Sequence, residues 1–381
     1  MKKALVVLLI LAVAGGVFAQ TTVKVTGNVR TGLAIGFTDE DGDAGKAKVD
    51  YIQNKGENGM RADLGVQVRS GDENSPYGKF GADFTLRARE GALFGADTFS
   101  QNLNAPTANI FWQPSSLLWI QVGTGGGGGF GTLGGIDRNH DIVDTGGLKL
   151  KLTPIAGLTI GAQAYYGATG ATKLFETVNY GFGAKYSLPI LDVAANLRYL
   201  AENTADKTEK IRFGAGANIK ALASMGLNAL AADVNTYGFG TDNFFLGVGE
   251  KVGFSASGLS LTVKAQEYLW MGTGDKDVIP MLFQGEVSYQ VSSLVKVGAE
   301  VRYIIGNKPS FNYRNASEIG GVDNVAAFSA KETAGLGVSP WVSFAVGPEV
   351  ILGLNLQKDM SNGASGKTQT ILIYTGVNLS Y

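Results

Sequence analysis

The side chains that most often carry out catalysis are nearly absent from this sequence. Its 381 residues include one histidine, His140, and no cysteine. The lack of cysteine excludes disulfides, thiolate zinc sites, iron–sulfur clusters and a cysteine nucleophile, and any Ser–His pair would have to use His140. We therefore expect that the protein is not an enzyme and that it holds no metal and no cofactor.

His140 lies in a polar segment rich in acidic residues. The segment reads Asp137-Arg138-Asn139-His140-Asp141, with Asp144 close by. Acid–base catalysis by His140 would need a nucleophile and a group that orients the ring, and the sequence identifies neither. We therefore interpret the segment as part of a polar loop.

Residues 123–128 have the literal form G-x-G-x-x-G that dinucleotide-binding sites share. Such a site requires a helix directly after the glycines, because the helix N-terminus faces the pyrophosphate. Residues 129–135 are too rich in glycine to hold a helix. We interpret the whole segment as a loop and expect no nucleotide site.

An acidic segment resembles a calcium-binding loop in part. Asp39, Asp41, Asp43 and Asp50 fall at loop positions one, three, five and twelve, but the required glycine at position six is Ala44 and position twelve is not glutamate. A solvated acidic loop is the favoured interpretation, and a weak surface calcium site is the alternative.

Residues 1–19 have the parts of a secretory signal peptide. Lys2 and Lys3 form a basic start, residues 4–13 are wholly apolar, and small side chains precede Gln20. The apolar run is shorter than the ~18 residues expected of a retained membrane anchor. We predict that residues 1–19 are cleaved and that residues 20–381 form one domain outside the cytoplasm.

From Gln20 onward, apolar and polar residues alternate with a period of two. In residues 23–37 the odd positions are mostly apolar and the even positions are polar, and residues 79–89 and 295–303 show the same alternation. Alternation over about ten residues is typical of a β-strand with one apolar face. No helical stretch separates these segments, so we predict an all-β protein with antiparallel strands.

The connections between the predicted strands alternate between short and long. Short turns are predicted at 113–116, 154–157, 255–258 and 346–348, and long polar loops at 38–58, 90–106, 124–146 and 306–332. This pattern is typical of a transmembrane, antiparallel, up-and-down β-barrel with short periplasmic turns and long extracellular loops. We predict about eighteen strands, of which 227–234 is the weakest; sixteen strands and a water-soluble β-sandwich are the alternatives.

Charge divides unequally between the two faces of these strands. The whole chain is nearly balanced, with 32 Lys and Arg against 33 Asp and Glu, so nucleic-acid binding is not expected. On the faces that would line the barrel, however, bases outnumber acids. The predicted pore-lining residues are Arg61, Arg69, Lys79, Asp83, Arg87, Arg89, Lys149 and Lys151. Such a lining predicts a weak preference for anions, unless the arginines pair with Asp63, Asp83 and the acids of residues 137–144 in a structural network.

The C-terminal strand carries a resemblance to a known class. Val377, Leu379 and the terminal Tyr381 lie at alternate positions and resemble the targeting strand of bacterial outer-membrane proteins, where the final residue is more often Phe. This resemblance implies a location in the outer membrane, contact with its lipid, and delivery by periplasmic chaperones to the barrel-assembly machinery. Residues 108–114 and 117–123 also resemble a hairpin of spirochaetal porin-like proteins.

The resemblance to porins suggests a role for the loop that contains His140. In the general porins that this architecture resembles, the third long loop folds into the lumen and narrows it. By that resemblance, the constriction would be formed by Asp137, Arg138, Asp141 and Asp144.

A channel for the passive diffusion of small hydrophilic solutes is therefore the leading hypothesis for function. A surface-exposed adhesin, or a structural barrel without significant channel activity, is the alternative. A fatty-acid transporter is disfavoured because no N-terminal hatch and no apolar interior are evident. The sequence leaves open whether the barrel is a monomer or a homotrimer.

Overall fold

The structure is a computed structural model of a chain that folds almost entirely into β-strands. It describes residues 21–39, 47–52, 60–72, 75–90, 103–124, 146–166, 178–200, 211–240, 244–270, 281–305, 334–359 and 369–380. The strands are β1 (Thr22–Asp39), β2 (Ala47–Ile52), β3 (Met60–Ser70), β4 (Lys79–Glu90), β5 (Leu103–Ser115), β6 (Leu118–Thr124), β7 (Gly147–Ile155), β8 (Leu158–Tyr166), β9 (Val178–Ser187), β10 (Leu191–Tyr199), β11 (Ile211–Ile219), β12 (Leu227–Tyr237), β13 (Phe245–Ala256), β14 (Leu259–Trp270), β15 (Met281–Gln290), β16 (Val295–Ile305), β17 (Ala334–Ala345), β18 (Glu349–Asp359) and β19 (Gln369–Ser380). The described part also contains one 3₁₀ turn, Ala223–Met225. It contains no helix that is both long enough and apolar enough to cross a membrane.

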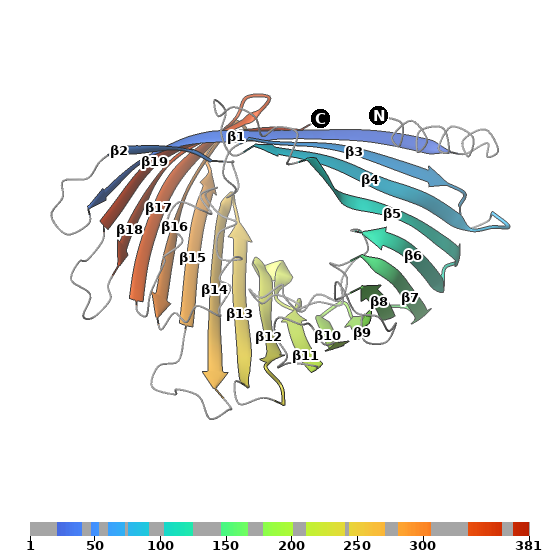
Figure 1. The fold of residues 1–381 in the computed structure, drawn as a ribbon. Coiled ribbons are helices and arrows are strands. Elements are labelled where there is room, and N and C mark those ends of the chain that lie inside the picture. The colour runs from blue at the N-terminus through green and yellow to red at the C-terminus, as the bar shows by residue number, and fades with distance from the viewer. Residues whose placement is uncertain are drawn as a thin grey trace.

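The strands form one closed antiparallel sheet. From β3 to β19 each strand pairs with the next along the chain, and β1 pairs with β19 to complete the ring (Figure 1). A ring has no open edge between its first and last strands, so the backbone groups along the wall find partners within it. The predicted up-and-down barrel is confirmed.

Two strands share one place in the barrel wall. On the side of β1 that does not face β19, β3 pairs with Thr22–Arg30 and β2 pairs with Gly32–Phe37. The two strands therefore follow one another along β1, and nineteen strands make an eighteen-strand barrel. The predicted number of strands is confirmed, but the prediction that residues 38–58 form only a loop is wrong, because Ala47–Ile52 extends the sheet.

A second predicted loop is also shorter than expected. Residues 90–106 were predicted to be a loop, whereas β5 begins at Leu103, and Asn104 lies opposite Arg87 of β4. The register of this pairing shifts between Thr85 and Arg87. Such an irregularity breaks the alternation of polar and apolar side chains, which hides the start of the strand from a reading of the sequence.

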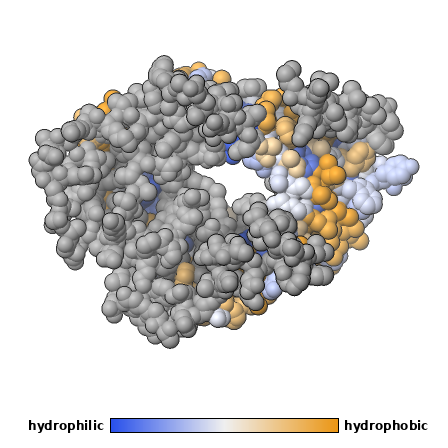
Figure 2. All heavy atoms as spheres, viewed as in Figure 1, coloured by the Kyte–Doolittle hydropathy of each residue, from blue (hydrophilic) through white to orange (hydrophobic). Residues whose placement is uncertain are grey.

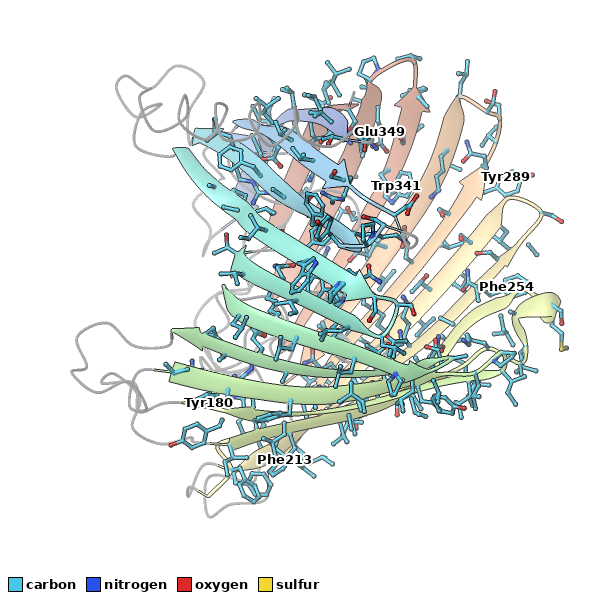
Figure 3. The ribbon with its side chains drawn as sticks, turned by 90° about the vertical axis from the view of Figure 1, so that its right-hand side faces the viewer. Tyr180, Phe213, Phe254, Tyr289, Trp341 and Glu349 are labelled. Atoms are coloured by element: carbon cyan, nitrogen blue, oxygen red, sulfur yellow. The ribbon has the colours of Figure 1, made fainter. Side chains whose placement is uncertain are left out.

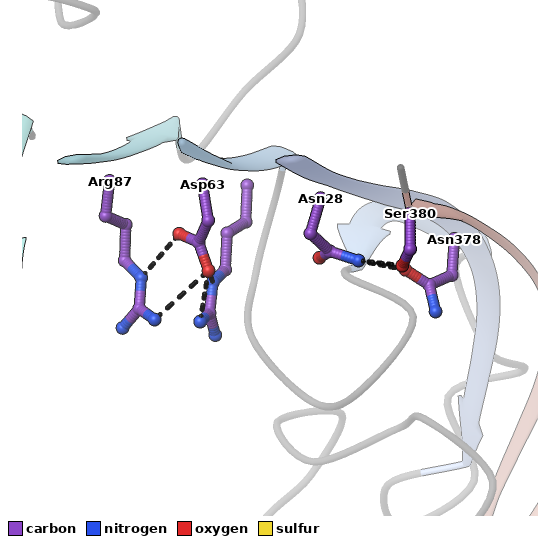
Figure 4. Close-up of polar contacts among 6 residues, drawn as sticks. Asn28, Asp63, Arg87, Asn378 and Ser380 are labelled. Carbon is purple, nitrogen blue, oxygen red and sulfur yellow. Dashed lines mark hydrogen bonds and ion pairs between the residues drawn. The ribbon is translucent and has the colours of Figure 1, made fainter. Parts of the chain in front are cut away.

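The closing seam between β1 and β19 is joined by side chains as well as by backbone. Asn28 of β1 donates hydrogen bonds from Nδ2 to Oδ1 of Asn378 at 2.6 Å and to Oγ of Ser380 at 2.7 Å (Figure 4). The carboxylate of Glu349 on β18 accepts hydrogen bonds from Asn378 and from Ser343 on β17. A polar network thus crosses the four strands at which the chain returns to its beginning.

Short turns connect the strands at one end of the barrel. Gly157 and Gly258 have φ values of +82° and +83°, which glycine adopts without the strain that a Cβ would add. Among the residues that the structure describes, Ser257, just before Gly258, is the one non-glycine residue with positive φ, at +49°. Both chain ends, near Thr22 and Ser380, lie at this same end.

Aromatic side chains gather near both ends of the wall. Figure 3 shows Tyr180 and Phe213 near the end with the long connections, and Phe254 and Tyr289 near the end with the short turns. Tyr180 packs against Tyr199 with ring centroids 6.4 Å apart. Two aromatic belts are expected where a barrel meets the two interfaces of a membrane.

Candidate functional site

The two faces of the barrel wall differ sharply in polarity. Large apolar side chains stand exposed on the outside, for example Val23, Ile110, Phe182 and Ile373. Figure 2 shows an opening in the middle of the molecule, with hydrophilic residues beside it and hydrophobic residues on the outer surface. The opposite positions of the strands carry buried polar side chains, which include Asn109, Gln121, Lys149, Gln163, Asn196, Arg198, Asn235, Gln266, Gln284 and Glu300. We call the side that they face the lumen, and it is the candidate functional site.

Two of the predicted pore-lining residues, Arg61 and Arg87, meet at one carboxylate, that of Asp63. Arg61 donates to Asp63 Oδ2 from Nε at 2.9 Å and from Nη2 at 2.6 Å. Arg87 of β4, which lies directly opposite Asp63, donates from Nε to Oδ1 at 2.7 Å and from Nη2 to Oδ2 at 3.1 Å (Figure 4). The three side chains together keep one positive charge, because a single carboxylate faces two guanidinium groups.

A second pair lies further along the same two strands. Arg69 of β3 donates from Nη2 to Oδ1 of Asp83 on β4 at 2.5 Å and from Nη1 to the carbonyl oxygens of Val68 and Ala82. Its guanidinium carbon lies 4.9 Å from the centre of the Phe111 ring on β5. Arg69 is thus held by a carboxylate, by two carbonyls and by a cation–π contact.

Glycine makes room for this arrangement. Gly81 stands between Arg69 and Phe111 in the register of β3, β4 and β5. A Cβ at position 81 would lie 2.2 Å from the Val68 carbonyl oxygen and 2.8 Å from Cε1 of Phe111. The ring therefore lies over the glycine and reaches the guanidinium two strands away.

The lysines of β7 line the lumen beyond these arginines. Lys149 is buried at 3% exposure, and the Lys151 ammonium lies 4.4 Å from the ring centre of Trp119 on the neighbouring β6. A similar contact occurs on another part of the wall, where the Lys296 ammonium lies 5.6 Å from the ring of Trp341. Lys79, at the start of β4, is half-buried.

Acidic residues occupy other strands of the lumen. Asp192 at the start of β10 accepts a 2.7 Å hydrogen bond from Lys220, and Glu300 on β16 accepts hydrogen bonds from Arg302 and from Gln284. The bases and acids of the lumen are therefore interleaved around the wall.

Some lumen charges were missing from the sequence prediction. They are Lys251, Asp233 and Glu349, which lie at inward positions of β13, β12 and β18. The alternation of each strand assigns these residues to the inner face once the strand limits are known. Those limits are hard to predict for Asp233, which lies on the weakest predicted strand, and for Glu349, which is the first residue of β18.

Several predicted functional residues lie outside the described residues. These are Asp137, Arg138, Asp141 and Asp144 of the predicted constriction, together with Tyr381 and the side chain of Arg89. Val377 and Leu379 of the predicted assembly signal lie on β19, opposite Thr31 and Val29 of β1. Within the described ranges, no group of three or more His, Cys, Asp or Glu side chains comes together as a metal site.

The barrel resembles several solved structures, although neither a family model nor a curated protein matches the chain. The outer membrane protein OprD from Pseudomonas aeruginosa matches with a TM-score of 0.54 and 12% sequence identity over 94% of each chain. Pseudomonas aeruginosa OpdL matches with a TM-score of 0.53 and 12% identity, over 94% of this chain and 98% of that one. Acinetobacter baumannii OccAB3 matches with a TM-score of 0.52 and 9% identity, over 93% of this chain and 99% of that one. The resemblance of residues 108–123 to spirochaetal porin-like proteins stays a prediction, and what these structures show is that the chain shares the fold of these barrels.

Proposed function

We propose that the protein is a bacterial outer-membrane channel through which small hydrophilic solutes diffuse passively. The observation that carries this proposal is the division of the closed wall into an apolar outer face and a charged, polar lumen. An eighteen-strand ring is too wide for side chains of the wall to fill, so water and small solutes can pass. The shared fold with OprD, an outer membrane protein, supports the same location.

The proposed location defines the partners of the barrel. The exposed apolar band contacts membrane lipid, and residues 1–19 direct export before they are removed. Periplasmic chaperones and the barrel-assembly machinery would receive the chain through its last strand, in which Val377, Leu379 and Tyr381 form the signal. None of these steps requires a cofactor or an enzymatic activity of the barrel itself.

We further propose a weak preference for anions. Asp63 and Asp83 offset part of the arginine charge on β3 and β4. The positive electrostatic potential that these two strands create in the lumen is therefore smaller than the number of arginines suggests. Lys151 has no ion pair with the described residues, since its ammonium packs on Trp119. Basic groups of this kind attract anions, and salt screening over ~8–10 Å keeps the preference weak.

Planar-bilayer recording tests the proposal in two stages. Purified full-length protein should open discrete ion-conducting channels, whereas an adhesin or a closed structural barrel should give none. In a tenfold KCl gradient the reversal potential should have the sign of anion selectivity. Cation selectivity of the wild type would remove the anion proposal and leave the channel intact.

Two variants then assign the selectivity to the lumen. Lys151→Glu should shift the reversal potential toward cations, because it replaces a lumen base by an acid and leaves no partner charge behind. Glu250→Gln is the control. It also changes the charge, because it removes a negative one, but Glu250 is exposed on the outer face, so the reversal potential should stay the same.

A further inference from the structure

One acidic side chain of the lumen is almost completely buried. Glu300 on β16 has 1% of its surface exposed. Its Oε1 accepts hydrogen bonds from Arg302 Nε and from Gln284 Nε2, the latter at 3.1 Å. Its other oxygen, Oε2, is also buried and has no hydrogen-bond donor. One oxygen of this carboxylate therefore accepts hydrogen bonds, and the other accepts none.

Two more oxygen-bearing side chains lie beside Glu300 on the neighbouring strand β15. Gln284 of β15, whose Nε2 bonds to Glu300, is also 1% exposed, and its Oε1 is buried without a donor. Glu286 of β15 lies directly opposite Glu300 in the register of the two strands. Its carboxylate forms no ion pair or hydrogen bond with the residues that the structure describes.

The nearby bases satisfy this cluster only in part. Arg302 is bonded to Oε1 of Glu300, and the Lys296 ammonium lies over the ring of Trp341. Lys264, opposite Gln284 on β14, and Lys296 both attract the Glu286 carboxylate, although neither forms an ion pair with it. Two carboxylates thus lie opposite each other on adjacent strands, and of the two it is Glu300 that is bonded to a guanidinium group.

This arrangement is costly unless a positive ion joins it. A buried oxygen without a donor is destabilising, and more so when it carries charge. Carboxylates directly opposite each other on neighbouring strands also repel. Buried polar atoms that lack partners in a native structure call for an explanation such as an ion, and carboxylate and amide oxygens are the ligands that hard divalent cations prefer.

We propose that Glu286, Glu300 and Gln284 form a binding site for a divalent cation such as Ca²⁺ in the lumen wall. Glu300 Oε2, Gln284 Oε1 and the Glu286 carboxylate would supply the ligand oxygens, and water the rest. The burial of Glu300 and Gln284 favours a small ion over the ammonium group of a larger solute. Because Arg302, Lys264 and Lys296 partly offset the two carboxylates, we expect affinity in the weak range of about 10⁻⁴–10⁻³ M.

The site would have a structural effect on the barrel. A bound cation would bridge β15 and β16 through side chains as well as through the backbone, and would remove the repulsion between Glu286 and Glu300. The inference stands apart from the proposed channel function, because it concerns ion binding to the wall and requires no solute transport.

Luminescence of Tb³⁺, a probe for calcium sites, tests the proposal on the folded full-length protein in detergent. Ser339 of β17 lies opposite Glu300, and Trp341 lies two residues further along the same strand. Its indole would therefore sensitise a Tb³⁺ ion bound at the site. Excitation of tryptophan should give saturable Tb³⁺ emission that Ca²⁺ displaces. Absence of saturable emission, or emission that Ca²⁺ does not displace, would overturn the proposal.

Matched variants locate the ion. Glu286→Gln and Glu300→Gln should each abolish most of the emission, and Trp341→Phe should strongly reduce it. Glu250→Gln, the same change at an exposed carboxylate of the outer face, should leave it unchanged. Heat-modifiable gel mobility verifies that each variant folds; Glu286 is half-buried, so Glu286→Gln keeps the test decisive if Glu300→Gln does not fold. Full emission from folded Glu286→Gln would place the ion elsewhere and refute the site.

Discussion

Asp63 on β3 and Arg87 on β4 lie directly opposite each other in the lumen wall and share two hydrogen bonds, of 2.7 and 3.1 Å. The same carboxylate accepts from Arg61, so it holds two guanidinium groups that would otherwise repel each other. The charge that the wall presents to the lumen at this point is therefore set by the acid as much as by the bases.

Asp63→Asn should increase the preference for anions. The substitution raises the net charge of the three side chains from one to two and keeps their shape. The ratio of anion to cation permeability should rise, by less than about tenfold, because salt screens the field within ~8–10 Å. Reversal potentials in a KCl gradient measure the change. An unaltered potential would mean that this cluster lies off the path of the ions.

Gly81→Ala should destabilise the barrel by roughly 1–3 kcal/mol, the usual cost of forcing an extra methyl group into a packed site. The added Cβ would collide with the Val68 carbonyl and with the Phe111 ring. Gly285→Ala is the matched control, since nothing lies within 4 Å of its added Cβ. Urea unfolding of both variants provides the comparison, and equal midpoints would contradict the role assigned to Gly81.

The barrel could be predicted from the sequence because its signal repeats along nearly the whole chain. Alternation marks each strand, and the lengths of the connections give the direction of the chain. The short strand β2 was missed because residues 47–52 stand in a polar stretch, and their pairing depends on the length of β1 rather than on their own pattern.

The contacts within the lumen could be predicted only in part. Alternation places Arg69 and Phe111 on the inner face, but their contact requires Gly81 to lie between them in register. Register depends on turns and irregularities such as the shift between Thr85 and Arg87. The sequence allowed two outcomes for these arginines, an unpaired basic lining or a network with the acids, and the structure pairs Asp63 with Arg61 and Arg87.

The topology of the barrel can be tested with single cysteines, because the natural chain contains none. A cysteine at position 45, in a long connection, should react with a membrane-impermeant maleimide on intact cells. A cysteine at position 116, in the short turn between β5 and β6, should not react until the outer membrane is opened. Labelling at position 116 alone would invert the proposed orientation.

Removal of Tyr381, or Tyr381→Asp, should impair assembly far more than Tyr374→Ala. The reason is the alternation of the terminal strand, which ends on an aromatic residue as in the targeting strands that it resembles. Tyr374 lies on β19 opposite Ala34 of β1, within the strand pair that closes the barrel. Heat-modifiable mobility of the membrane fraction measures the folded amount. Normal folding of the truncated chain would show that the last residue carries no signal.

Glu250 gives the last prediction, because it is a carboxylate on the outer face of β13. It is exposed, it alternates with the apolar Val248 and Val252, and it lies opposite Ala232 and Ala265 on the neighbouring strands. A charge on the lipid face of a barrel costs up to about 2–4 kcal/mol for a base at the midplane, and less for an acid. Glu250→Leu should therefore stabilise the protein by about 1 kcal/mol in lipid vesicles, seen as a higher urea midpoint, and should have a smaller effect in detergent. Val252→Leu, an apolar exchange on the same face, should change neither midpoint. A loss of stability in Glu250→Leu would mean that this carboxylate is bound by a partner in the membrane.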